Sequence, residues 1–446
     1  MARFEARKVG EQAFAQGGIE KIGDAQVTER PRLRELARVV ARLRKHAGVD
    51  ESHGAILVMC WHYTKHWIPD TRLNGLHAMS PFLRRSAEFF RPLYRRLPVP
   101  IKAPLRRWIL GPAEPKPSSP GSEYGQRLAV ETEAFTAQTD VHDLPAIAHY
   151  WSNRYLLPKL EAFGFSNPDG FFARYLELAH AGADSRPVRF ASLGCGNCDT
   201  EVRVAGLLAG RGLRDFIIDC VDINRAMLDR GQALAAAAGV SEHIRPVVGD
   251  FNDWRPETRY AAIMANQSLH HVLKLEGLFA AIEQALDANG RLVTSDMIGR
   301  NGHMRWPEAL EIVQEFWAEL PPQSRYNVQL KRHEERFGNW DCSSEGFEGI
   351  RAQDVLRLLI ERFDFELFVA YANLIDIFID RSFGPHFDVN EAADLAFIDR
   401  VHARDEAEIL AGRIKPTHMM AVLRKRPYAG ETQTFAHLTP RFCLRP

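Results

Sequence analysis

The chain has 446 residues with 57 Lys and Arg, 57 Asp and Glu, and a formal net charge of zero. This length predicts a catalytic domain with an appendage and excludes a single small domain. Its start lacks the apolar core of a signal peptide, and no apolar run approaches the ~20 residues of a membrane-spanning helix, so we expect a cytoplasmic protein.

The first quarter of the chain is basic. Residues 1–111 hold 21 Lys and Arg against 10 Asp and Glu, a net charge of +11, and the remainder carries −11. We expect this region to be mainly helical, with an amphipathic helix over 29–45. Arg alternates with Phe, Tyr and Trp over 81–110, which leaves two interpretations open. This segment packs on the catalytic domain or a second subunit in a homodimer, or it contacts an anionic membrane surface or a lipid-linked substrate. Nucleic-acid binding is disfavoured because no such module is recognisable.

A Pro/Ser/Gly-rich segment over 112–123 predicts a linker, because its composition cannot bury a core. Helices follow, and then strands and helices alternate, which predicts a parallel sheet with helices on both faces. The expected strands span 188–193, 217–221, 244–248, 261–265, 291–295, 365–371 and 417–426. The predicted fold is α/β, a seven-stranded, mostly parallel, doubly wound sheet over 124–428, with a tail over 429–446.

Two connections are longer than the sheet requires, at 299–365 and 380–415. Both follow strands, at the edge of the sheet where α/β proteins bind ligands. We therefore expect them to form helical covers over a substrate.

The most informative motif is a Gly-x-Gly turn, Gly194-Cys195-Gly196, between an apolar strand and a helix. Such a turn lets backbone N–H groups approach a ligand closely. Asp222 ends the next expected strand, which suits a ligand with a ribose diol. A dinucleotide-binding fingerprint requires a third glycine, and Asp199 stands there. An NAD(P)-dependent oxidoreductase is therefore the less favoured alternative.

The run Leu193-Gly-Cys-Gly-Asn197 resembles motif I of the class I S-adenosylmethionine (SAM)-dependent methyltransferases. Three further segments extend the resemblance in the same order, Val247–Asn252, Ala261–His271 and Leu286–Asp296. Together they cover roughly 145–426. The resemblance implies SAM as cofactor, S-adenosylhomocysteine as product, and a seventh strand inserted antiparallel. A SAM-binding adaptor without catalysis remains a second alternative.

The resemblance also implies roles for the cofactor residues. Asp222 would accept both ribose hydroxyls, and Asp250 would accept the adenine amino group with Phe251 beside the ring. Asn266 would meet the methionyl end. An acid at a strand end or in a loop also occurs as an ordinary turn or cap residue. The remaining expected cofactor contacts, which line the same strand tips, are Leu193, Gly194, Cys195, Gly196, Ile223, Met227 and Gln267.

The sequence departs from the family pattern at two positions of the turn. Ser192 stands where relatives often carry an acid for the SAM amino group, and Glu201 can supply that carboxylate instead. Cys198 replaces a third small residue. Arg154 is a candidate partner for the SAM carboxylate, although it can equally be a surface residue beside core aromatics.

The candidate catalytic residues on the acceptor side are His270, His271 and Asp296. A histidine with a pKa near neutrality can deprotonate a hydroxyl, and Asp296 could hold the acceptor hydroxyl. The structural alternative is that the histidines only cap or pack. The sequence lacks an Asn/Asp-Pro-Pro-Tyr-type motif after the fourth strand, which argues against methylation of DNA bases or glutamine. We expect O-methylation of a small molecule, a sugar or glycolipid, or a natural product.

We expect no metal. Cys195 and Cys198 form a C-x-x-C, but no second such pair follows. His303, His386 and His418 show no ligand spacing with a carboxylate.

Overall fold

A computed structural model describes residues 123–137, 144–344 and 346–445. The predicted basic region and its amphipathic helix lie outside the described residues, as does the linker up to residue 122. The first described element, helix α6 (Glu123–Ala137), begins where the predicted linker ends. No helix within the described ranges is both long enough and apolar enough to cross a membrane.

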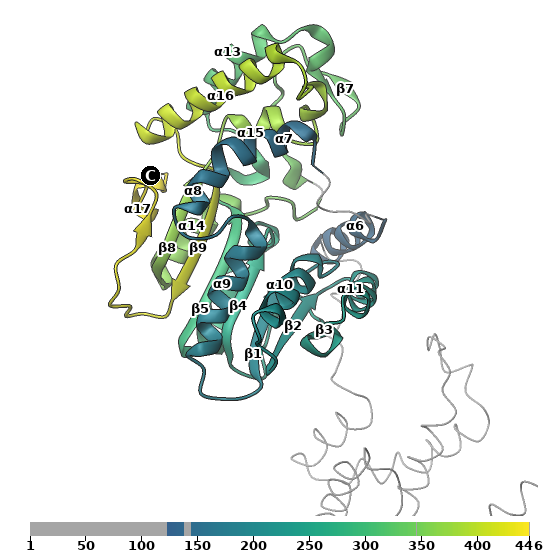
Figure 1. Cartoon of the computed structure of the whole chain (residues 1–446). Coiled ribbons are helices and arrows are strands. Elements are labelled where there is room, and N and C mark those ends of the chain that lie inside the picture. The colour runs from purple at the N-terminus through teal and green to yellow at the C-terminus, as the bar shows by residue number, and fades with distance from the viewer. Residues whose placement is uncertain (1–122, 138–143, 345, 446) are drawn as a thin grey trace, which may run out of the picture. The chain divides into compact units, whose positions relative to one another are not determined.

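The core is one large sheet (Figure 1). From one edge to the other, its strands are β10 (Gln433–Thr434), β8 (Asp364–Tyr371), β9 (His418–Arg424), β5 (Leu286–Met297), β4 (Tyr260–Asn266), β1 (Val188–Leu193), β2 (Phe216–Asp222) and β3 (Ile244–Val248).

The strand order confirms the predicted doubly wound sheet. Strands β1 to β5 pair in parallel, and β9 inserts antiparallel between β5 and β8, as the family resemblance implied. The two-residue strand β10 adds an eighth strand to the seven expected, because the last segment of the chain folds back beside β8.

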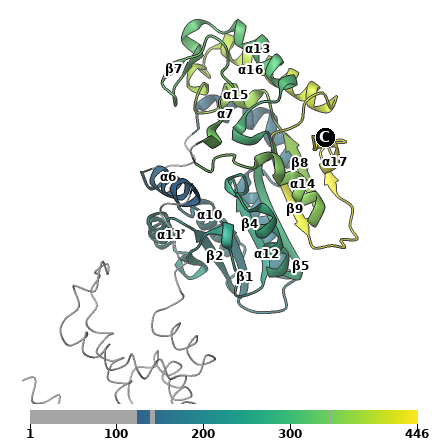
Figure 2. The same ribbon diagram turned by 180° about the vertical axis from the view of Figure 1, so that it is seen from behind.

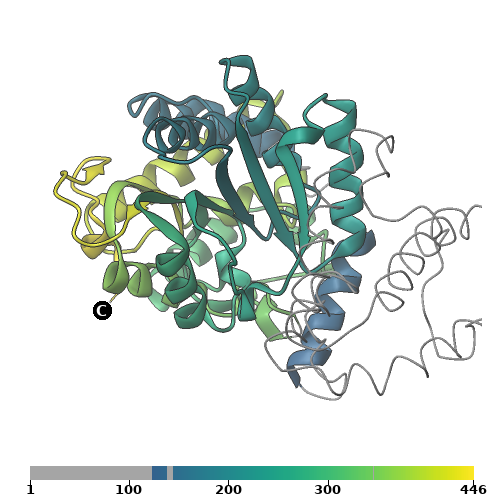
Figure 3. The same ribbon diagram turned by 90° about the horizontal axis from the view of Figure 1, so that it is seen from below.

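Helices cover both faces of the sheet (Figures 2 and 3). The five that flank it are α9 (Pro168–Ala181), α10 (Asp199–Gly210), α11 (Arg225–Ala237), α12 (Leu275–Ala285) and α14 (Ala352–Arg362). Each face has its own apolar core. One contains Phe171 of α9 and Phe190 of β1, and the other contains Phe279 of α12 and Leu359 of α14. Burial on two faces explains why β1 and β4 are almost continuously apolar in sequence.

A further group of helices lies above the sheet in Figure 1, on the side of α6. Its elements are α7 (Ala146–Trp151), the π-helical segment η3 (Ser152–Leu156), α8 (Leu157–Glu161), α13 (Pro307–Glu319), the strands β6 (Tyr326–Asn327) and β7 (Arg332–His333), α15 (Ile375–Ile379) and α16 (Ala392–Leu410). The long connections after β5 and β8 thus form a mostly helical layer, as predicted. The small β6–β7 hairpin was not predicted. A last short helix, α17 (Pro440–Cys443), ends the described chain.

Strand register brings the predicted motif residues to one edge. Leu193 pairs with Val221 of β2 and with Ala265 of β4, so the residues that follow these three strand positions are neighbours. Gly194, Asp222 and Asn266 are those residues. The carboxyl edge of the sheet therefore gathers side chains that the sequence spreads over more than 70 positions.

Candidate active site

The turn after β1 is closely packed. Gly194 and Gly196 have φ angles of 69° and 53°, a region that residues with a Cβ rarely adopt. A Cβ on Gly194 would lie 2.6 Å from the Cβ of Ser268, the residue two positions before His270. The Ser268 hydroxyl also donates to the Leu193 carbonyl oxygen at 2.7 Å. The turn after β1 and the turn after β4 are therefore in direct contact.

Asp222 faces the glycine turn from the end of β2. Its two oxygens accept hydrogen bonds from the backbone N–H groups of Gly196 at 2.9 Å and Asn224 at 2.8 Å. The side chain is buried, and burial raises the pKa of its carboxyl above the ordinary value. Asn224 in turn caps α11, accepting from the N–H groups of Ala226 and Met227. This places the Met227 methyl 3.1 Å from the position of a Cβ on Gly196.

Asp250 lies beyond β3, where its Oδ1 accepts from the N–H of Asn252 at 2.8 Å. Its Oδ2 accepts from the hydroxyl of Tyr124 in α6 at 2.5 Å. Phe251 approaches Gly194 within 3.4 Å of the position of a Cβ. Asp250, Phe251 and the glycine turn therefore border the same region, and α6 reaches it as well.

A carboxylate of the following helix contacts Ser192. Glu201 is buried in the first turn of α10 and accepts a hydrogen bond from the Ser192 hydroxyl at 2.6 Å. Burial and, to a smaller extent, the nearby Cys198 raise the pKa of Glu201 to about 8. Cys198 has a φ of 58°, a left-handed conformation that suits glycine better.

The C-x-x-C of the turn gains a third thiol from β2. The sulfurs of Cys195, Cys198 and Cys220 lie within 4.8 Å of one another, and those of Cys195 and Cys198 are 3.6 Å apart. Hydrogen bonds from the other two thiols lower the pKa of Cys198 to about 5. Sequence spacing could not reveal Cys220, because parallel pairing of β1 and β2 brings it there.

Three other expected cofactor residues have the following environments. Asn266 donates to the Thr200 hydroxyl at 3.2 Å, at the start of α10. Gln267 has a φ of 52° and donates its backbone N–H to Ser295 at 2.8 Å. The Arg154 guanidinium lies 3.6 Å from Asp399 of α16. The structure thus brings Asn266 to the glycine turn and holds Arg154 against the helical layer.

His270 and Asp296 form a buried pair. The His270 Nδ1 lies 2.8 Å from an Asp296 oxygen, and Asp296 also accepts from the backbone N–H groups of Ser268, Leu269, His270 and Met297. Burial alone would lower the pKa of His270, but Asp296 and Glu348 outweigh it and raise the pKa to about 10. Asp296 is fully buried, and its oxygens already accept these hydrogen bonds. Its role is therefore to hold His270, and not to bind the acceptor hydroxyl.

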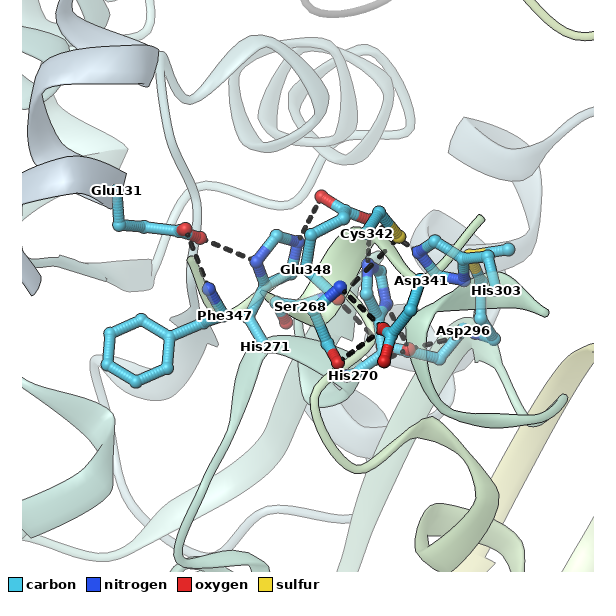
Figure 4. Close-up of polar contacts among 12 residues, drawn as sticks. Glu131, Ser268, His270, His271, Asp296, His303, Asp341, Cys342, Phe347 and Glu348 are labelled. Atoms are coloured by element: carbon cyan, nitrogen blue, oxygen red, sulfur yellow. Dashed lines mark hydrogen bonds and ion pairs between the residues drawn. The ribbon is translucent and has the colours of Figure 1, made fainter. Parts of the chain in front are cut away.

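His271 lies in a second carboxylate environment (Figure 4). Its Nδ1 is 2.6 Å from Glu131 of α6, and its Nε2 is 3.5 Å from Glu348. Glu348 also lies 2.5 Å from the Nε2 of His303, which follows β5 in the short helix η7 (Asn301–His303). Sequence spacing gave no sign of this carboxylate partner, because Glu348 lies 45 positions from His303.

Sequence reasoning missed three residues of this region, Tyr124, Glu131 and Glu348, and it named His303 without finding its partner Glu348. Tyr124 and Glu131 lie about two turns apart on the same face of α6 and contact Asp250 and His271, respectively. Their partners lie more than 120 positions away in the chain, so no local motif marks them.

Comparison with known proteins identifies the domain. Residues 191–290 match the model of a methyltransferase domain. This segment contains the glycine turn, Asp222, Asp250 and both histidines after β4, and its strands have the class I order. No curated protein sequence matches the chain at a significant level.

Solved structures give distant matches. A geranyl diphosphate C-methyltransferase from Streptomyces coelicolor A3(2), in complex with Mg²⁺, geranyl diphosphate and S-adenosylhomocysteine, is 15% identical, with a TM-score of 0.36. That match covers 69% of this chain and 100% of the other. An O-methyltransferase from a trans-AT PKS multienzyme of Brevibacillus brevis, in complex with S-adenosylhomocysteine, is 13% identical, with a TM-score of 0.35. That match covers 69% of this chain and 88% of the other.

Proposed function

We propose that this SAM-dependent methyltransferase transfers its methyl group to a hydroxyl of a small molecule, a sugar or glycolipid, or a natural product. The observation that carries the proposal is the contact between the two turns. Ser268 touches Gly194 of the cofactor turn and begins the segment that carries His270 and His271. Groups able to take a proton therefore adjoin the cofactor site.

On the cofactor side, Asp222 accepts hydrogen bonds from the ribose hydroxyls. Asp250 accepts a hydrogen bond from the adenine amino group beside Phe251. Backbone groups of the Leu193–Gly196 turn, with Ile223, Met227 and Gln267, surround the nucleoside and methionyl parts. Glu201 and Asn266 hold the methionyl end, and Arg154 is the least supported contact because it lies against Asp399. These assignments follow the family resemblance and the gathering of the strand tips at one edge.

On the acceptor side, SAM already carries a good leaving group, so the protein must align the acceptor oxygen with the methyl and help remove its proton. The base is one of the two histidines after β4. The pKa of His270 is raised to about 10 by Asp296 and Glu348, so His270 already carries a proton at neutral pH, which leaves His271 for this role. His271 is the less enclosed, with 13% of its side chain exposed against 4% for His270. Asp296 is a positioning residue that holds His270 and the surrounding backbone.

Two measurements test this function. Calorimetry with SAM, S-adenosylhomocysteine and NAD(P) should show binding of the two SAM species only. Methyl-labelled SAM is then offered to pairs of compounds that differ only in a free or a blocked hydroxyl, and label should pass to the free form. Absence of SAM binding would overturn the function, and label on carbon or nitrogen would overturn the hydroxyl acceptor.

A further inference from the structure

The imidazoles of His270, His271 and His303 converge on the carboxylate of Glu348 (Figure 4). The Nε2 of His270 lies 3.3 Å from one oxygen of Glu348, and the Nε2 of His271 lies 3.5 Å from the other. One ligand atom from each of His270, His271 and Glu348 lies within 4.8 Å of the ligand atoms of the other two. In a tetrahedral site with bonds of about 2.0–2.1 Å, ligand atoms are about 3.4 Å apart. The spacing therefore approaches that of a metal site.

The outer nitrogens of two histidines are held by further carboxylates. Asp296 lies 2.8 Å from Nδ1 of His270, and Glu131 lies 2.6 Å from Nδ1 of His271. Histidines that bind metals through Nε2 generally bond their other nitrogen to a carboxylate or carbonyl, which fixes the ring and its tautomer. Both rings are thus oriented with Nε2 toward the shared centre.

The backbone that brings His303 and Glu348 together is specialised. Gly302 donates its N–H to the Gly349 carbonyl at 2.9 Å, and both glycines have positive φ angles of 63° and 64°. A Cβ on Gly302 would lie 1.9 Å from an Asp341 oxygen. Only glycine fits this crossing, and the crossing places His303 and Glu348 side by side.

We propose that His270, His271 and Glu348 bind one divalent transition-metal ion, with His303 hydrogen-bonded to Glu348 beside them. The net charge supports this, because three carboxylates, Glu131, Asp296 and Glu348, surround three histidines. Imidazole ligands suit Zn²⁺ or Fe²⁺, whereas Mg²⁺ and Ca²⁺ prefer oxygen-only ligands. The site should therefore bind Zn²⁺ and its spectroscopic substitute Co²⁺, and excess Mg²⁺ should not displace them.

Metal binding at this site does not depend on the proposed function. The chemical role of the metal does rest on the proposed function. A metal ion at this position would bind the acceptor hydroxyl and lower its pKa, so that the hydroxyl would lose its proton to water before the oxygen takes the methyl group from SAM. The ion would then replace an imidazole as the group that activates the acceptor. Because Ser268 joins the histidine segment to Gly194, the activated oxygen would lie on the cofactor side of the cluster.

The test is Co²⁺ titration of the full chain after treatment with a chelator, followed by absorption spectroscopy. We expect one Co²⁺ per chain, visible bands of nitrogen and oxygen ligands, and no intense thiolate charge-transfer band. Glu348→Gln and His271→Gln should each weaken Co²⁺ binding by about 100-fold. Glu131→Gln, outside the ligand set on α6, should weaken it by about 10- to 100-fold. His333→Gln, an exposed histidine of β7, is the matched control and should bind as the unaltered protein does.

Two results would overturn the proposal. One is the absence of Co²⁺ binding by the unaltered protein. The other is binding with a thiolate band that Glu348→Gln leaves unchanged, which would place the metal at Cys195, Cys198 and Cys220. SAM affinity is measured on each variant. Retained SAM affinity shows that a variant is folded and separates failure of the metal site from failure of the proposed methyl transfer.

Discussion

The cofactor side and the acceptor side of this site are assembled in different ways. Gly194, Asp222 and Asp250 follow three strands within 57 positions, and adjacent pairing of those strands alone brings them together. The histidine cluster needs four segments, those that carry Glu131, His271, His303 and Glu348, which span more than 200 positions. The cofactor side is therefore formed by neighbouring strands of the sheet. The histidine cluster forms only when distant segments fold back onto the sheet.

Breaking the cofactor side should give the largest effect. Asp222→Ala should weaken SAM binding by about 100-fold or more, because it removes a charged acceptor for two hydroxyls, each hydrogen bond being worth about 1.5–3 kcal/mol. Calorimetric titration with SAM measures the loss. Asp229→Ala, an exposed acid of α11 paired with Arg225, is the control and should bind SAM normally. Normal SAM binding by Asp222→Ala would refute the ribose assignment.

Breaking the anchor of the acceptor side should affect folding more than cofactor binding. Asp296→Asn replaces an oxygen that accepts buried N–H groups with an amide that donates, so some donors lose their partner. We expect the free energy of unfolding to fall by about 2 kcal/mol, measured by urea denaturation. Asp253→Asn, at an exposed site, should change it by less than about 0.5 kcal/mol. An equally small change in Asp296→Asn would show that the anchor is dispensable.

The same contrast separates what the sequence could and could not predict. Strands β1 to β4 were placed within a residue or two, because apolar runs bounded by glycines and acids mark buried parallel strands. Parallel strands end at a common edge, so Asp222 and Asp250 could be assigned to it in advance. The edge strand β10 was not foreseen, since two residues have no periodicity to detect.

The missed residues share one physical reason. Glu131 and Glu348 are ordinary charged residues of a helix and a loop, and only tertiary packing gives them histidine partners. Cys220 joins Cys195 and Cys198 through strand pairing and not through a spaced motif. Composition and spacing report local structure, whereas these contacts are formed between distant segments.

The buried Glu201 predicts that SAM affinity depends on pH. Below about pH 8 its buried carboxyl is mostly protonated, and pairing with the SAM ammonium requires that the proton leave. The charged or titratable neighbours Cys198 and Asp199 both favour the protonated form, while the Ser192 hydroxyl favours the carboxylate. SAM affinity should therefore rise from pH 6 toward pH 8, by at most about tenfold per unit. Near pH 8 the SAM amino group begins to lose its own proton, which limits the rise at the upper end of this range.

Glu201→Gln keeps the size of the side chain but has no proton to lose. Its SAM affinity should be weaker at pH 8 and nearly constant between pH 6 and pH 8, as measured by calorimetry across that range. A rise of equal slope in both proteins would assign the pH dependence to another group. A flat profile in the unaltered protein would show that Glu201 does not meet the SAM ammonium.

The smallest predicted effect tests whether the two sides are independent. Helix α6 touches both, since Tyr124 donates to Asp250 and Glu131 contacts His271. Tyr124→Phe removes one hydroxyl and keeps the ring against Phe347. If that hydroxyl orients Asp250 while adenine uses a remaining lone pair, SAM affinity should fall about fivefold, the cost of one hydrogen bond of about 1 kcal/mol. Tighter SAM binding would show instead that Tyr124 and adenine compete for Asp250. Helix α6 would then have to leave Asp250 when the cofactor binds, and Glu131 on the same helix would move with respect to His271, which would couple the acceptor side to the cofactor side.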